Sequence, residues 1–111
     1  MVLADLGADV VIENFRVGAA DAMGLGFDAL RARNERLVYC SITGFGTDRR
    51  PPARPGYDFI AQAESGLMAV TGDAEPTKVG VAIVDVLTGL HAAVATSVTK
   101  KTWFWNAVIL W

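Results

Sequence analysis

One carboxylate stands inside an otherwise apolar run of the sequence. Asp85 lies in the stretch KVGVAIVDVLTGL, with four apolar residues before it and two after it. An acid in such surroundings is costly unless a nearby group stabilises it. Two roles are open for it. A carboxylate sheltered from water can act as a nucleophile in covalent catalysis, whereas an aspartate ahead of a helix can cap its free amides. The residues by themselves favour the cap.

Other chemistry finds less support in the residue types. His91 and Cys40 are the only histidine and the only cysteine, so no pair stands at metal-ligand spacing. Cys40 lies in a strand-like run, where a buried, inert thiol is the usual outcome. His91 follows Asp85 by six residues, about 240° around a helix, so the two would not share a helical face. Neither a Walker-type loop nor a GxGxxG turn after a strand is present.

Two glycine-containing turns, ENFRVG and SITGFG, follow strand-like runs. In an open parallel sheet, ligands bind beyond the carboxyl ends of the strands, which is where both turns would lie. Glycine lets the backbone approach a bulky ligand closely, and Arg16 could meet a phosphate. By their spacing alone the turns favour a purely structural role, and a ligand site is the alternative.

The elements that must position these residues follow from the apolar pattern. β-branched and apolar runs predict two strands, and helical spacing predicts a short helix capped by Asp28, a helix broken near Gly66, and a long, mostly apolar helix. The predicted ranges are strands at 10–12 and 37–42 and helices at 28–34, 57–70 and 81–98. This order predicts an α/β protein with a parallel sheet and crossover helices.

Composition limits the remaining possibilities. The chain has 111 residues, of which 52% are hydrophobic, and a net charge of −2, so we expect one domain at most and no nucleic-acid partner. No apolar run is long enough for a membrane span, and a single cysteine fits a soluble, cytoplasmic protein. The tail TSVTKKTWFWNAVILW has three tryptophans. It either continues the preceding helix or is an accidental terminus from a truncated or frame-shifted reading frame.

Four segments in a fixed order resemble the class III CoA-transferase family, also called CaiB/BaiF. They read ADVVIENFRVG, MGLGFDALRARNERLVYCSITGFG, RPGYDFIAQAESGLMAVTG and KVGVAIVDVLTGLHAAVA, and together they span Ala8 to about Ala95. The resemblance implies a fragment of the CoA-binding, Rossmann-like large domain over residues 1–96. Residues 97–111 would then be an atypical aromatic tail.

The resemblance also implies roles for individual residues. Asp85 matches the nucleophile of the family's VGVAIxDxxTG motif. The CoA contacts would come from the two glycine-containing turns, at Asn14, Phe15, Arg16, Thr43, Gly44 and Phe45. The substrates would be an acyl-CoA thioester and a carboxylic acid, with no metal and no permanently bound cofactor. Some members carry an arginine that meets the CoA phosphate where this chain has Ala22, which puts that contact in doubt.

The family contains transferases and, as relatives, α-methylacyl-CoA racemases. The racemases use a histidine in a GHD motif, and Tyr57 stands at that position here. An unperturbed tyrosine, with a pKa of about 10, is a poor proton shuttle, so transferase is favoured over racemase. Members run to several hundred residues and form interlocked homodimers. We therefore expect this chain alone to be an incomplete, inactive piece of such an enzyme; the alternative is a non-catalytic remnant or a CoA-binding module.

Overall fold

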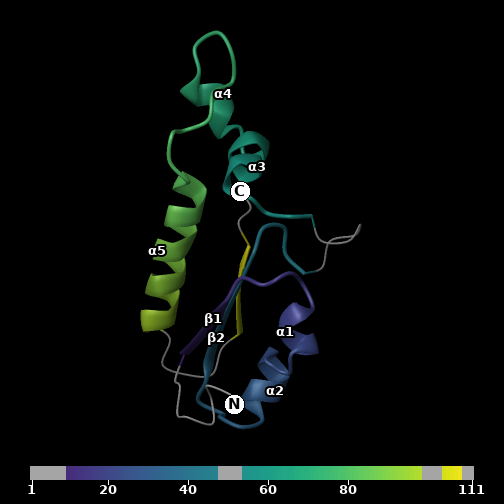
Figure 1. Cartoon of the computed structure of the whole chain (residues 1–111). Coiled ribbons are helices and arrows are strands. Elements are labelled where there is room, and N and C mark those ends of the chain that lie inside the picture. The colour runs from purple at the N-terminus through teal and green to yellow at the C-terminus, as the bar shows by residue number, and fades with distance from the viewer. Residues whose placement is uncertain (1–9, 48–53, 99–103, 109–111) are drawn as a thin grey trace.

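The computed structural model describes residues 10–47, 54–98 and 104–108 of the chain. Strands and helices alternate along most of it (Figure 1). In chain order the elements are β1 (Val10–Glu13), α1 (Ala19–Ala22), α2 (Phe27–Arg31), β2 (Val38–Thr43), α3 (Asp58–Glu64), α4 (Leu67–Thr71), α5 (Ile83–Val98) and β3 (Phe104–Val108).

The strands form one parallel sheet in the order β1-β2-β3. Val10 is paired with Val38 in the first ladder, and Tyr39 is paired with Phe104 in the second. Parallel pairing requires a crossover between consecutive strands, which α1 and α2 provide first and α3 to α5 provide next. The predicted α/β class, the parallel sheet and both predicted strands are confirmed, with each strand end within one residue of its predicted place.

The helices confirm most of the predicted pattern. Gly66 has φ 81°, a left-handed conformation that favours glycine, and it separates α3 from α4 where the break was predicted. α5 begins at Ile83, two residues later than predicted, and ends at Val98 as predicted. The prediction that Asp28 caps its helix is wrong, because α2 begins at Phe27 and Gly26 is the N-cap residue.

Helices cover both faces of the sheet, with α1 and α2 on one side and α5 on the other (Figure 1). Because successive strand residues point to opposite faces, Tyr39 belongs to the first side and Cys40 to the second. On the first side, Leu30 of α2 packs with Leu37 and Tyr39 in a buried cluster. The ring of Phe27 meets that of Tyr39 edge-on, with centroids 5.9 Å apart. This cluster fixes α2 against the sheet.

The second side is only partly covered. α5 contacts β2 and β3, yet among its residues only Val84 and Ala92 are buried. Leu90, Val94 and Val98 remain 58%, 63% and 68% exposed. The long, mostly apolar helix is therefore largely exposed in this chain, because α5 meets the sheet along one narrow face.

The molecule is elongated, measuring 54 × 31 × 21 Å. Its radius of gyration is 16.1 Å, whereas a compact domain of this length has about 13 Å. α3 and α4 extend beyond the end of the sheet (Figure 1). In the part of the chain that the structure describes, no helix is long and apolar enough to cross a bilayer.

The aromatic tail contains a strand. Residues Phe104–Val108 form β3 and pair with β2 over its five residues. The interpretation that the tail continues the preceding helix is therefore wrong for these residues. Aromatic and β-branched residues are well suited to a strand, and β2 offers a free edge on which they can pair.

Candidate active site

Asp85 lies in the first turn of α5, and this end of α5 lies beyond the carboxyl edge of the sheet (Figure 1). The side chain of another residue caps this helix. Asp58, the first residue of α3, accepts hydrogen bonds at Oδ1 from the backbone N–H of Val84 (2.8 Å) and of Asp85 (3.0 Å). The interpretation of Asp85 as the cap of its own helix is therefore wrong. Its backbone is held, and its carboxylate is left available.

The charge state of Asp85 is shaped by two effects. Although the residue as a whole is exposed, nearby protein partly desolvates its carboxyl group and disfavours the ionised form. The negative charge of Asp58 adds to this, so both effects raise the pKa of Asp85 above its ordinary value. A carboxylate with a raised pKa is more basic, which suits either a nucleophile or a proton acceptor.

The apolar shelter expected around Asp85 is absent among the described residues. Asp85 is exposed, and so are Val81 and Val86 on either side of it. The run of apolar residues therefore does not predict burial here, because most of these side chains are themselves exposed. A water-excluding pocket at this position would need further protein to cover it.

A cavity of about 460 Å³ lies on the α1–α2 side of the sheet. Its floor includes Tyr39, Ser41 and Thr43, which alternate along β2 and so share one face. The predicted residues Phe15, Arg16 and Thr43 line it, whereas Asn14, Gly44 and Phe45 are not among its lining residues. Asp85 is also absent from the lining, so the structure does not bring the candidate nucleophile into this cavity.

The cavity has an acidic interior. Glu13, Asp21 and Asp28 line it, against the single guanidinium of Arg16. Burial, with the charges of Glu13 and Asp21 adding to it, raises the pKa of Tyr39 to about 12. A polyanion such as a pyrophosphate would be repelled from this interior, although Arg16 offers it one favourable contact. The acidic lining escaped prediction because its members come from three separate segments of the chain.

The SITGFG turn contacts the loop that leads into α3. Thr43 Oγ1 accepts a hydrogen bond from the N–H of Gly46 (3.0 Å) and closes the turn. Gly44 lies directly against Gly56, so closely that a Cβ built on Gly44 would be 2.3 Å from the Gly56 Cα. Two residues further on is Asp58. The SITGFG turn thus contacts Gly56, and Gly56 lies two residues before Asp58, whose side chain caps the first turn of α5.

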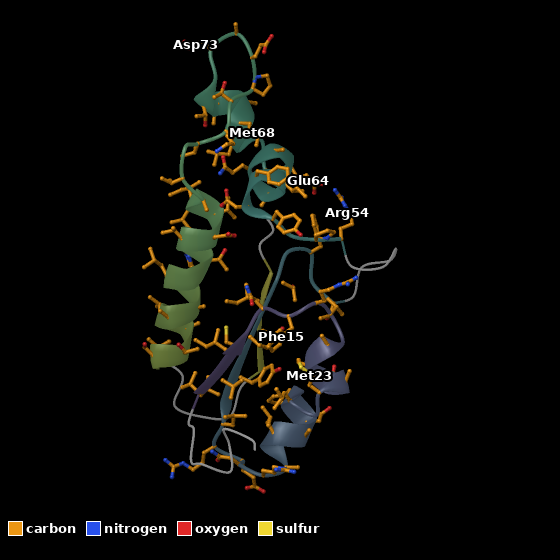
Figure 2. The ribbon with its side chains drawn as sticks, viewed as in Figure 1. Phe15, Met23, Arg54, Glu64, Met68 and Asp73 are labelled. Atoms are coloured by element: carbon orange, nitrogen blue, oxygen red, sulfur yellow. The ribbon has the colours of Figure 1, made fainter. Side chains whose placement is uncertain are left out.

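Aromatic and basic side chains support this junction. The guanidinium of Arg54 lies 4.8 Å from the ring centroid of Phe45, a cation–π distance. The same guanidinium pairs with Glu64 of α3 (Figure 2). Phe45 therefore anchors Arg54. Tyr57, the residue that separates transferase from racemase in the family resemblance, is exposed and stacks on Phe59.

The remaining candidates are structural. Cys40 is fully buried, and burial raises the pKa of its thiol, with Glu13 adding to the effect. This confirms the predicted burial of Cys40, and the low reactivity of its thiol stays a prediction. His91 is exposed, and its Nδ1 lies 2.8 Å from the carbonyl of Leu87 one turn earlier. Among the described residues, no group of three or more histidine, cysteine, aspartate or glutamate side chains could hold a metal ion.

The fold and this site define an α/β protein segment with an available carboxylate at a helix N-terminus and glycine turns at the carboxyl edge of a parallel sheet. The chain belongs to CoA-transferase family III, whose family profile matches residues 3–99. The family resemblance expected from the four sequence segments is therefore confirmed.

Curated relatives support this assignment. The chain is 47% identical over 90 residues to a succinate–glutarate CoA-transferase from Agrobacterium fabrum, which is 79% of this chain and 22% of that protein. It is 42% identical over 95 residues to the human succinyl-CoA:glutarate CoA-transferase, which is 82% of this chain and again 22% of the relative. The chain thus spans about a fifth of the length of the curated relatives it matches.

Solved structures agree. A CaiB/BaiF family protein from Brucella suis matches with a TM-score of 0.82 and 43% identity, over 93% of this chain and 30% of that one. A hypothetical protein from Mycobacterium tuberculosis matches with a TM-score of 0.83 and 31% identity, over 96% of this chain and 33% of that one. The elongated shape and the uncovered face of α5 fit a segment that packs within a larger domain.

Proposed function

We propose that this chain is the nucleophile-bearing segment of a CoA-transferase, which moves CoA from an acyl-CoA thioester to a carboxylic acid. The observation that carries the proposal is the setting of Asp85. Its carboxylate is available in the first turn of α5, its backbone amide is held by Asp58, and its pKa is raised. The family membership over residues 3–99 supports the same chemistry.

The proposed reaction divides one exchange into easier steps. The Asp85 carboxylate attacks the thioester carbonyl, the carbon–sulfur bond breaks, and CoA leaves as a thiolate with a mixed anhydride on Asp85. The thiolate attacks the aspartyl carbonyl, which releases the donor acid as a carboxylate and leaves an aspartyl-CoA thioester. The acceptor carboxylate then repeats both steps in reverse and restores Asp85. No net proton or water is consumed.

The start of α5 can assist this exchange. The first amides of α5 are already hydrogen-bonded, but the positive end of the helix dipole still favours negative charge, which develops on the carbonyl oxygen at each attack. The raised pKa makes the ionised carboxylate a better nucleophile. The anhydride also has to be kept from water. The described residues leave Asp85 exposed, so we expect the chain alone to be inactive and the shelter to come from the rest of a full-length, dimeric enzyme.

For CoA itself, we propose contacts at the two glycine-containing turns. Phe15, Arg16 and Thr43 line the cavity, and Arg16 is the contact proposed for a CoA phosphate. Because three carboxylates line the interior, a neutral part of CoA would enter the cavity and the phosphates would stay near Arg16. Asn14, Gly44 and Phe45 would act at the rim. Tyr57, in place of the racemase histidine, favours transfer over racemisation.

A segment graft tests this function. Residues 3–99 would replace the matching segment of the Agrobacterium fabrum succinate–glutarate CoA-transferase, a relative 47% identical over the matched region. We expect the graft to transfer CoA from succinyl-CoA to glutarate, and the 111-residue chain alone to show no transfer. In the graft, Asp85→Ala should lower kcat by at least about 1,000-fold, because it removes the covalent route.

The graft needs a control for folding. Asp73→Ala changes an exposed aspartate in the loop after α4, and it should leave transfer unchanged. Undiminished transfer by the Asp85→Ala graft would contradict the proposed function. So would a graft with the circular dichroism spectrum and oligomeric state of the parent enzyme but no transfer.

A further inference from the structure

Gln62 is a buried polar side chain whose hydrogen bonds hold together two separate segments. It is 1% exposed. Its Oε1 accepts from the N–H of Val79 (2.8 Å), and its Nε2 donates to the carbonyl of Val81 (3.3 Å) and to Asp58 Oδ2 (2.5 Å). A buried amide is costly when unsatisfied, and here each polar atom has a partner. Gln62 therefore ties α3 to the residues just before α5.

Asp58 extends this connection to the candidate nucleophile. Its Oδ2 accepts from Gln62, while its Oδ1 accepts from the N–H groups of Val84 and Asp85. Each carboxylate oxygen thus has a different task. Gln62 fixes the rotation of the Asp58 carboxylate, and Asp58 fixes the first turn of α5.

We propose that Gln62 and Asp58 form a positioning clamp, which fixes the backbone at Asp85 and keeps a like charge beside its carboxylate. The inference rests on the proposed role of Asp85 as the nucleophile. It adds two positioning residues that do not themselves need to touch the substrate. A conformationally fixed nucleophile loses less entropy on the way to the transition state, and a neighbouring negative charge makes it more basic.

The other charged groups near this junction are engaged elsewhere. Glu64, at the opposite end of α3, pairs with Arg54. The ammonium of Lys78, in the loop before α5, donates to the carbonyl of Val79 (3.4 Å). Within α5 the described titratable residues are Asp85 and His91, and His91 lies against the carbonyl of Leu87. Asp58 is therefore the charge on α3 that acts on Asp85, in agreement with the raised pKa of Asp85.

A clamp of this kind makes a specific prediction about paired substitutions. In Asp58→Asn, Oδ1 can still face the amides of α5, but the new amide group then meets the Gln62 amide donor-to-donor. In Gln62→Glu, two carboxylates meet instead. In the double variant, the new amide at position 58 can donate to the new carboxylate at position 62, which can still accept from the N–H of Val79. Only the longer hydrogen bond to the Val81 carbonyl (3.3 Å) is lost. The two changes should therefore rescue each other.

The test uses the 111-residue chain and NMR, so it needs no turnover. Amide hydrogen exchange is measured at Val84 and Asp85, and the Asp85 side-chain carboxyl is titrated. We expect each single change to speed exchange at both amides by at least about tenfold, since each breaks a hydrogen bond to a charged group. The double variant should return exchange to within about threefold of the original chain. Asp58→Asn should also lower the titration midpoint of Asp85.

Glu64→Gln is the matched control, because it removes the same charge from the other end of α3. It should leave both amides and the Asp85 midpoint unchanged. Unchanged exchange in both single variants, no rescue in the double variant, or an unchanged Asp85 midpoint in Asp58→Asn would each overturn the clamp. Since none of these readouts depends on CoA transfer, loss of the proposed function and loss of the clamp are separable results.

Discussion

Replacing Gly44 by alanine should loosen the junction between the SITGFG turn and the entry to α3. The new Cβ would lie 2.3 Å from the Gly56 Cα and 3.0 Å from the Gly56 nitrogen. Ordinary van der Waals contact between carbon atoms begins at about 3.5 Å, so one backbone segment has to move by about 1 Å. Gly44 is not among the glycines with positive φ, so this close approach is the reason that glycine is needed.

The size of the effect follows from the kind of atom that is displaced. Overpacking costs about 1–3 kcal/mol, and a backbone obstacle yields less easily than a flexible side chain, so we expect a loss of about 2 kcal/mol in the free energy of unfolding. For a chain of this size the loss corresponds to about 10 °C in Tm. Urea and thermal unfolding followed by far-UV circular dichroism would measure both quantities.

Gly89 provides a control of opposite sign. It lies inside α5, and a Cβ built there meets nothing within 4 Å. Gly89→Ala should therefore stabilise the chain by about 1 kcal/mol, the difference in helix propensity between the two residues. A Gly44→Ala variant as stable as the original chain, measured beside a stabilised Gly89→Ala variant, would refute the close approach of the two loops.

Two further predictions concern titratable side chains. Because the pKa of Asp85 is raised in the folded state, the folded chain holds this proton more tightly, and the stabilisation it brings is lost as the pH rises through that pKa. Asp85→Asn should therefore raise the urea midpoint of unfolding at pH 7. The gain should vanish below pH 3.8, the ordinary pKa of an aspartate, because the carboxyl is then protonated in both the folded and the unfolded state. An equal gain at both pH values would contradict this. Cys40 is fully buried with a raised thiol pKa, so a water-soluble disulfide reagent should modify it about 100-fold more slowly in buffer than in urea; equal rates would contradict its burial.

The sequence predicts the parts of the fold that local pattern controls. The apolar runs at 10–12 and 37–42 identify β1 and β2, because continuous β-branched and apolar residues are typical of strands covered on both faces. Gly66 identifies the break between α3 and α4 because its backbone conformation favours glycine. The four family segments identify Asp85 as the candidate nucleophile with little help from the structure.

Features that depend on distant contacts could not be predicted in the same way. β3 at Phe104–Val108 is a strand because β2 offers it a free edge. The sequence of the tail alone does not indicate that this edge exists. Asp58 caps a helix that begins 25 residues later, beyond the reach of any local capping pattern. The exposure of Asp85 has a similar cause, because apolar neighbours in sequence do not decide what covers a side chain in space.

The central claim is that the carboxylate of Asp85 becomes covalently acylated during transfer. The most direct test is to quench the grafted enzyme with hydroxylamine during turnover of succinyl-CoA and to sequence, by mass spectrometry, the tryptic peptide that begins at Val79 and contains Asp85. The account predicts a hydroxamate on Asp85 that requires acyl-CoA and is absent after Asp85→Asn. An unmodified peptide from an enzyme that is actively transferring CoA would contradict it.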